Sequence, residues 1–276
     1  MAKQYSLAYL TVSGCSPSEM IHIAARTGYD FVGLRLIPMG VPGEVPFRTD
    51  DKAQITKIGA ALKETGVRLL DLELARIVED VDPRSYLPAM EVAAGWGARH
   101  VISSAWTARR DDRNFIVDSY AEICDLAKPF GLTVNLEFPS FSRLTNLQEA
   151  AEIVRAADRS NGGILIDTLY FHFSGIRVEE LEELPGHWIH FLHVCDAPEK
   201  IPDSKDEMVH VARDERLYVG EGCIDFSSIL QRLPQGPISI ELPHAARVKK
   251  MGYEGHARRS LETAKLHLDH IPTRLP

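Results

Sequence analysis

TVNLEFPSFSRLTNLQEAAEIVRAADRSNGGILID, the stretch that covers residues 133–167, holds two short apolar runs on either side of a helical segment. The runs 133–138 and 163–167 are mostly apolar along their length, which is typical of strands that are buried on both faces of a parallel sheet. Asn146 precedes the segment between them and can cap its N-terminus. The stretch therefore predicts a strand, a helix and a second, parallel strand.

The same alternation continues in both directions along the chain and predicts a single (β/α)8 barrel, an α/β fold of the TIM-barrel type. A length of 276 residues suits one such domain, so we predict that residues 1–276 form it and that residues 272–276 fray at its end. Ser16 before Pro17 is a helix start signal, and Gly66 and Gly131 are stop signals. The predicted strands are residues 6–12, 31–37, 68–74, 100–105, 133–138, 163–167, 190–194 and 238–242.

Composition limits the classes of partner. A net charge of −8 is the wrong sign for a protein that neutralises nucleic-acid phosphates. The chain shows no signal-peptide pattern and no apolar run of about 18 residues, and its four cysteines are widely spaced. We therefore expect a cytoplasmic protein without a membrane or nucleic-acid partner. The sequence leaves a homo-oligomer open.

Four predicted strands in succession finish with a residue that can bind a metal. Glu137, Asp167, His193 and Glu241 each follow an apolar β segment directly. Ionised carboxylates are rarely buried without a compensating charge, so their repeated occurrence at this position indicates a divalent cation. Three carboxylates and one imidazole suit Mn²⁺, Mg²⁺, Co²⁺ or Zn²⁺, and the residues do not choose among these ions.

The chain resembles the xylose-isomerase-like TIM-barrel superfamily, which contains sugar isomerases and epimerases and the metal-dependent apurinic endonucleases. The resemblance covers nearly the whole chain and lies in short motifs that recur in order: 135–138 (NLEF), 166–168 (IDT), 192–197 (LHVCDA), 220–226 (GEGCIDF) and 240–241 (IE). It implies that Glu137, Asp167, His193 and Glu241 bind the metal. It also implies that Glu137 and Glu241 are catalytic and relay the proton of the reacting carbon.

Further residues are candidates for substrate binding. Arg213 and Arg216 lie in the long segment 196–222 after the seventh strand, where a helical turn would place both on one face. Arg35 and Glu73 lie on the second and third strands, although each could instead belong to a structural ion pair. His172 and His244 follow ligand strands and complete the set, and Asp196 is a candidate to orient a ligand. The sequence does not say whether the segment 196–222 is a mobile lid.

These residues favour a metal-dependent isomerase or epimerase that moves a proton next to a carbonyl in a small sugar-like or hydroxycarbonyl substrate. A lyase or dehydratase acting on a related hydroxyketone is the alternative, because it would begin with the same proton removal. A phosphodiesterase like the apurinic endonucleases is less favoured, because the second, third and fourth strands do not end in histidine. A non-catalytic partner subunit is disfavoured by the complete ligand set.

Overall fold

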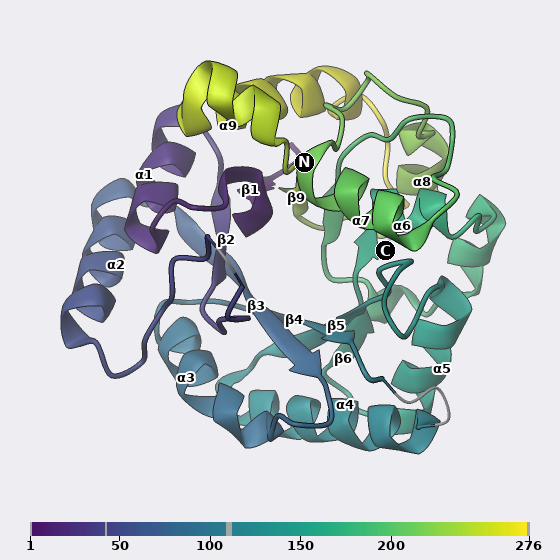
Figure 1. The fold of residues 1–276 in the computed structure, drawn as a ribbon, viewed down its shortest axis with the longest axis horizontal. Helices are drawn as coiled ribbons and strands as arrows, with labels where there is room; N and C mark the ends of the chain where they lie inside the picture. Colours follow the sequence, from purple (N-terminus) through teal and green to yellow (C-terminus); the bar gives the residue numbers. More distant parts are fainter. Residues whose placement is uncertain (1, 42, 109–111, 275–276) are drawn as a thin grey trace.

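The computed structural model describes residues 2–41, 43–108 and 112–274, and within them the chain forms a parallel barrel. The strand order in the sheet is β6-β5-β4-β3-β2-β1-β9-β8-β7. Because β6 and β7 are consecutive pieces separated only by Leu165, they occupy one position and the ring closes, as Figure 1 shows. The strands are β1 (Tyr5–Leu7), β2 (Phe31–Arg35), β3 (Arg68–Ile77), β4 (His100–Ala105), β5 (Thr133–Glu137), β6 (Gly162–Ile164), β7 (Ile166–Asp167), β8 (Leu192–Val194) and β9 (Ile238–Ile240).

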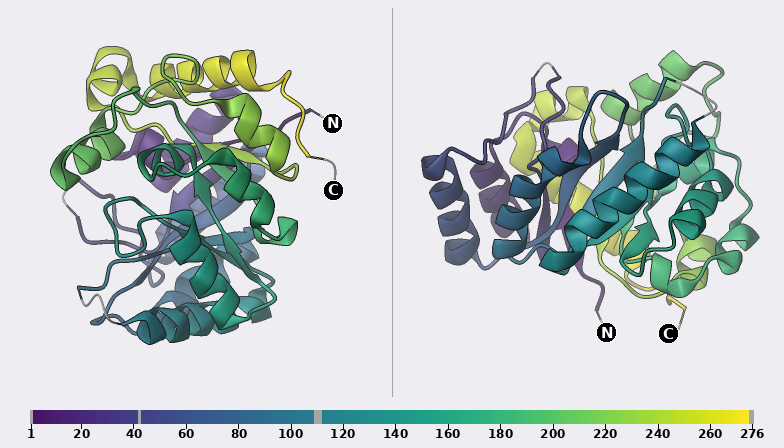
Figure 2. Two further views of the ribbon diagram at one scale, coloured as in Figure 1. Left: turned by 90° about the vertical axis from the view of Figure 1, so that its right-hand side faces the viewer. Right: turned by 90° about the horizontal axis from the view of Figure 1, so that it is seen from below.

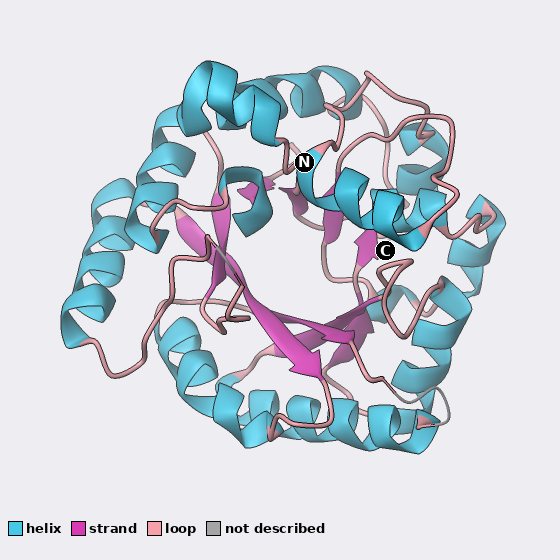
Figure 3. Ribbon diagram, viewed as in Figure 1, coloured by secondary structure: helices cyan, strands magenta, loops and turns pink. Residues whose placement is uncertain are grey.

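Helices surround this ring of strands (Figure 3), and the predicted (β/α)8 fold is confirmed. The capping residues that the sequence predicts at helix ends are confirmed. The side chains of Ser16 and Asn146 accept hydrogen bonds from the first turns of their helices, and Gly66 and Gly131 adopt the left-handed conformation beyond theirs. The helices are α1 (Pro17–Thr27), α2 (Lys52–Thr65), α3 (Leu87–Gly95), α4 (Arg113–Ala127), α5 (Leu147–Ala157), α6 (Thr168–Phe173), α7 (Lys205–Asp214), α8 (Phe226–Arg232) and α9 (Ala245–Leu268).

Apolar side chains form two separate cores. The larger lies between the strands and the surrounding helices. The smaller fills the inside of the barrel and consists of Phe31, Leu70, Leu74, Ile102, Leu165 and Phe191. Leu74 and Ile102 of this smaller core also line a cavity, which is lined as well by Glu137 at the C-terminal end of β5.

Two predicted boundaries are wrong. Residues 9–12 were expected to continue the first strand but form a 3₁₀ helix, because a short apolar run alone does not distinguish the two conformations. The sequence pattern predicts a last helix from about residue 253 to residue 270, whereas the helix begins at Ala245 and bends at Gly252, whose φ is 73°. The fraying of residues 272–276 stays a prediction; within the described part, the Arg274 amide donates to the Leu233 carbonyl at 3.0 Å. Residues 275–276 of the predicted tail lie outside the described part.

The chain ends and the loops lie at opposite ends of the barrel. The two termini emerge side by side on one side of the molecule in Figure 2. The loops that follow the strands lie at the other end, and the segment 196–222 contains helix α7. Within the described ranges, no helix combines the length and apolar character needed to cross a membrane.

Candidate metal centre and active site

Glu137, Asp167, His193 and Glu241 meet at the C-terminal end of the barrel. Glu137 and Asp167 end β5 and β7, His193 lies in β8, and Glu241 directly follows β9. Each contributes one potential ligand atom, and these atoms all lie within 4.8 Å of one another. All four side chains are buried. The structure therefore brings together the whole ligand set expected from the sequence.

The Nδ1 atom of His193 faces the three carboxylates. It lies 3.5 Å from Glu241 Oε1, 3.7 Å from Glu137 Oε1 and 4.0 Å from Asp167 Oδ2. Neither ring nitrogen of His193 has a hydrogen-bond partner among the described residues, although both are buried. Unpartnered buried nitrogens beside converging carboxylate oxygens fit a site for a divalent cation.

The electrostatics of the cluster also fit a bound cation. Burial, together with the charges of Glu241 and Asp167, raises the pKa of Glu137 well above its usual range. Burial also raises the pKa of Asp167. For His193, burial favours the neutral ring, but the carboxylates outweigh it and raise its pKa to about 10. An ion held by these four residues would supply the positive charge that the proton otherwise provides.

Arg216 contacts two carboxylates of this cluster. Its guanidinium donates to Asp167 Oδ2 at 2.7 Å and lies 2.9 Å from Glu241 Oε2, and it also donates to the Tyr170 hydroxyl at 3.1 Å. The side chain is 0% exposed and does not line the cavity. We expected Arg216 to grip substrate from the same helical face as Arg213. However, α7 ends at Asp214, so Arg216 lies beyond the helix and turns inward.

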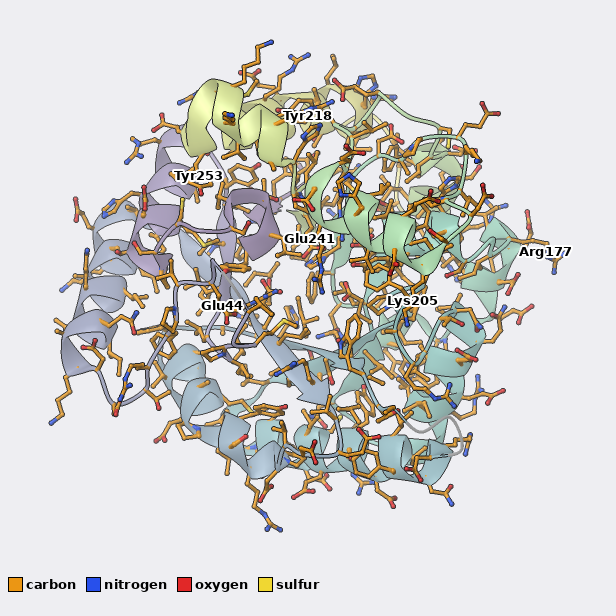
Figure 4. The ribbon with its side chains drawn as sticks, in the orientation of Figure 1. Glu44, Arg177, Lys205, Tyr218, Glu241 and Tyr253 are labelled. Carbon is orange, nitrogen blue, oxygen red and sulfur yellow. The ribbon has the colours of Figure 1, made fainter. Side chains whose placement is uncertain are left out.

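A cavity of about 530 Å³ lies above the cluster. Glu137, His193 and Glu241 line it, whereas Asp167 does not. In Figure 4, Glu241 and Glu44 lie toward the middle of the ring, while Arg177 extends outward at the rim. One part of the cavity wall is therefore polar and carries three of the candidate metal-binding residues. Much of its remaining wall is aromatic, formed by Tyr9, Trp106, Phe141, Tyr170 and Tyr253.

Arg35 and Glu73 both line the cavity and pair with each other. Arg35 donates from its Nη2 to Glu73 Oε2 at 3.0 Å, and its guanidinium stacks 4.4 Å above the Tyr9 ring. Glu44, from the loop after β2, lies 3.8 Å from Arg35 and accepts from the Met39 and Gly40 amides. The Nε of Arg35 is buried without a partner among the described residues. The pair therefore keeps one free donor.

The remaining candidates from the sequence are placed differently. Arg213 lines the cavity but is exposed, so it lies at the mouth. His172 does not line it: its Nε2 lies 3.1 Å from the Pro198 carbonyl, and the ring borders a separate cavity of about 330 Å³. His244 is half-buried before α9 and is likewise not a lining residue. Neither histidine lines the candidate cavity.

Asp196 does not orient His193. Its Oδ1 accepts from the amides of Ala197 and Ile224, and its Oδ2 accepts from those of Gly220 and Gly222. The carboxylate therefore ties both ends of the segment 196–222 together. The aromatic wall and Glu44 were not among the residues expected from the sequence. The available signal was position, since Trp106 directly follows β4 and Glu44 lies in a long loop on the same face.

The fold and the site together define a family. Residues 21–266 match the model of the xylose isomerase-like TIM barrel, and the chain belongs to this family.

Two curated relatives are named inosose isomerase. That of Bacillus velezensis (strain FZB42) is 22% identical over 274 residues, which cover 92% of this chain and 91% of that protein. That of Bacillus subtilis (strain 168) is 27% identical over 188 residues, 64% of this chain and slightly under two thirds, 63%, of that protein. Among solved structures, the IOLI protein with a bound zinc atom superposes with a TM-score of 0.78 at 20% identity, covering 98% of this chain and 99% of that one. This structural likeness shows the shared fold.

Proposed function

We propose that this protein is a divalent-metal-dependent isomerase or epimerase that moves a proton next to the carbonyl of a small polyhydroxylated ketone. One observation carries the proposal. Glu137 and Glu241 belong to the four-residue cluster and also line the cavity, whereas Asp167 belongs to the cluster alone. Two carboxylates can therefore contact both a metal and a bound substrate.

Glu137, Asp167, His193 and Glu241 would hold the ion, because their potential ligand atoms converge in a buried site. When bound, Mn²⁺, Mg²⁺, Co²⁺ or Zn²⁺ would polarise the substrate carbonyl and make the neighbouring C–H more acidic. The oxygen-rich ligand set is compatible with each of these ions. The zinc in the IOLI structure supports a divalent ion in a protein of this fold.

The two glutamates approach the cavity from different strands. Glu137 ends β5 and Glu241 follows β9, with the β6/β7 and β8 positions between them in the ring. One carboxylate can take the proton from the carbon next to the carbonyl, and the other can return a proton to the opposite face. The number of protons on the substrate is then unchanged and the configuration at that carbon is inverted. Return of the proton to the former carbonyl carbon, with the hydroxyl proton passing from one oxygen to the other, gives the isomer instead.

The cavity wall supports a polyhydroxylated, uncharged substrate. The Arg35–Glu73 pair has no net charge and offers a free Nε–H beside carboxylate oxygens, which suits neighbouring hydroxyl groups. Tyr9 and Trp106 provide flat apolar surfaces for C–H groups. The inosose isomerase relatives support a cyclic polyhydroxy ketone as the first substrate to test.

Solvent-deuterium exchange tests the proposal. We expect the metal-loaded protein to exchange the proton next to the carbonyl of an inosose, a ketose or hydroxypyruvate, as seen by proton NMR. Glu137→Gln and Glu241→Gln keep the side-chain size but remove the base, so both should lose turnover at least a hundredfold, within the range that acid–base catalysis contributes. Glu152→Gln on the exposed face of α5 is the matched control and should react normally.

A metal-loaded Glu137→Gln variant that turns over at the parent rate would contradict the proton-transfer assignment. Loss of water from the substrate, seen as new conjugated ultraviolet absorbance, would identify the lyase instead.

A further inference from the structure

A row of polar side chains crosses the inside of the barrel next to the candidate metal centre. Ser6, Asp71 and Ser239 are buried to 0%, 2% and 0% exposure. Ser6 Oγ, Asp71 Oδ1 and Ser239 Oγ have no hydrogen-bond partner among the described residues. Three unpartnered buried polar atoms are costly, so a structure keeps them only where another group uses them.

The strand register brings these side chains together beside His193. Ser239 is the partner of His193 between β8 and β9, and Ser6 is the partner of Ser239 between β9 and β1. The neighbours of each, Tyr5, Leu7, Ile238 and Ile240, belong to the outer core. Because side chains alternate along a strand, Ser6 and Ser239 face the barrel interior.

Asp71 reaches this row from β3 because of two local features. The register between β2 and β3 shifts after Val32, so that Leu70 is bulged out of the pairing and Asp71 turns inward opposite Gly33. Gly33 has no side chain, and a Cβ built there would lie 2.8 Å from both carboxylate oxygens of Asp71. The carboxylate therefore extends across β2 toward β1. Burial raises the pKa of Asp71 to about 7, and among the charged neighbours His193 acts most strongly against this rise.

The second ring nitrogen of His193, Nε2, is a buried donor that needs an acceptor. Nδ1 faces the three carboxylates, so an imidazole that binds a metal through Nδ1 carries its proton on Nε2. This Nε2 is buried and has no partner among the described residues. Ligand histidines ordinarily donate their other N–H to an oxygen, which fixes both the tautomer and the ring orientation.

We propose that Asp71 is a positioning residue of the metal centre, accepting the Nε2–H of His193 through one bridging water that the hydroxyls of Ser6 and Ser239 also hold. The inference rests on the proposed function, since it assumes that His193 binds a metal. A bridging water is needed because no direct hydrogen bond joins the two side chains. Four polar partners are enough to hold a buried water. Asp71 touches neither metal nor substrate and acts only through His193.

Cobalt titration of the metal-free protein tests this role. Binding is followed by the visible absorption of Co²⁺ in competition with a chelator. Loss of a partner of this kind typically weakens metal binding 10- to 100-fold, which we expect for Asp71→Ala, with a smaller loss for Asp71→Asn. Gly33→Ala leaves Asp71 in place but should push its carboxylate away and reproduce the loss. Ser103→Ala removes a buried hydroxyl that already bonds to the Ala75 carbonyl, and it should bind cobalt like the parent.

A second readout separates positioning from a merely structural role. In the zinc-loaded parent, the Nε2–H proton of His193 should exchange slowly and be visible by NMR, and it should be lost in Asp71→Asn or Gly33→Ala at unchanged thermal stability. If Asp71→Ala and Gly33→Ala both bind cobalt like the parent, the role of Asp71 is overturned but the proposed function is not. A parent protein that binds no cobalt would overturn this role and the proposed function together.

Discussion

Arg216 carries a full charge at a position with no contact to solvent. Among the described residues it is the bulkiest fully buried side chain. Its partners Asp167 and Glu241 come from two different strand ends, so one guanidinium holds two potential metal ligands in fixed positions. Burial acts against the charged form, but these carboxylates outweigh it and keep the pKa of Arg216 well above its usual range.

We predict that Arg216→Met lowers the free energy of unfolding by about 3–5 kcal/mol, because it leaves two buried carboxylates without their partner. Urea unfolding in the presence of a chelator measures the effect. Arg213→Met is the matched control, and its exposed position predicts a change within about 0.5 kcal/mol. A loss below about 1 kcal/mol in Arg216→Met would show that the ion pairs are not important for stability.

At the scale of elements, the segment between β8 and α8 is organised by a single carboxylate. Asp196 receives four backbone amides, while antiparallel hydrogen bonds join its own backbone to that of Leu217. These bonds fix the start and end of the segment on either side of α7. Arg213 in the last turn of α7 lines the cavity, whereas Arg216 after the helix is fully buried and does not.

Replacement of Asp196 should therefore loosen the segment without unfolding the barrel. We expect Asp196→Ala to cost about 1–3 kcal/mol, the range for buried donors left without a partner. The amides of Gly220, Gly222 and Ile224 should lose protection in hydrogen exchange, while amides in β4 and β5 keep theirs. Asp203→Ala, in the same segment but paired only with exposed Lys200, is the control. Unchanged protection at all three amides would contradict this role.

For the whole molecule, His256 helps to close the barrel at its last helix. Its Nε2 lies 2.8 Å from the Leu242 carbonyl beyond β9, and its Nδ1 lies 2.8 Å from the Tyr218 hydroxyl of the long segment. This arrangement suits a neutral ring that donates from Nε2 and accepts at Nδ1. Burial lowers the pKa of His256 to about 4.

Because of His256, the free energy of unfolding should decrease as the pH is lowered. In the unfolded chain the pKa of histidine is about 6.5, so below that pH the unfolded state takes up a proton that the folded state does not. The contribution is present above pH 6.5 and is lost as pH falls toward 4. Between pH 7 and pH 5, the parent should lose about 2 kcal/mol relative to His256→Gln, measured by urea unfolding at both pH values. Parallel stability curves for the two proteins would contradict this assignment.

The sequence by itself determined the barrel and the four residues of the candidate metal centre. Both signals are local. A capping residue such as Asn146 acts on its own helix, and a polar residue directly after a buried strand must emerge at the end of the barrel. Because all strands are parallel, their C-terminal ends meet, so Glu137 and Glu241 could be placed together without knowledge of any contact.

Only the tertiary structure decided which way the other side chains point. Arg216 does not lie on the predicted helical face, because α7 ends two residues before it. The His172 side chain points toward the Pro198 carbonyl and does not line the cavity. Asp71 faces inward because of a register shift with β2 and the absence of a side chain at Gly33. Such directions depend on partners far away in the chain, and the spacing of residues along one segment carries no information about those partners.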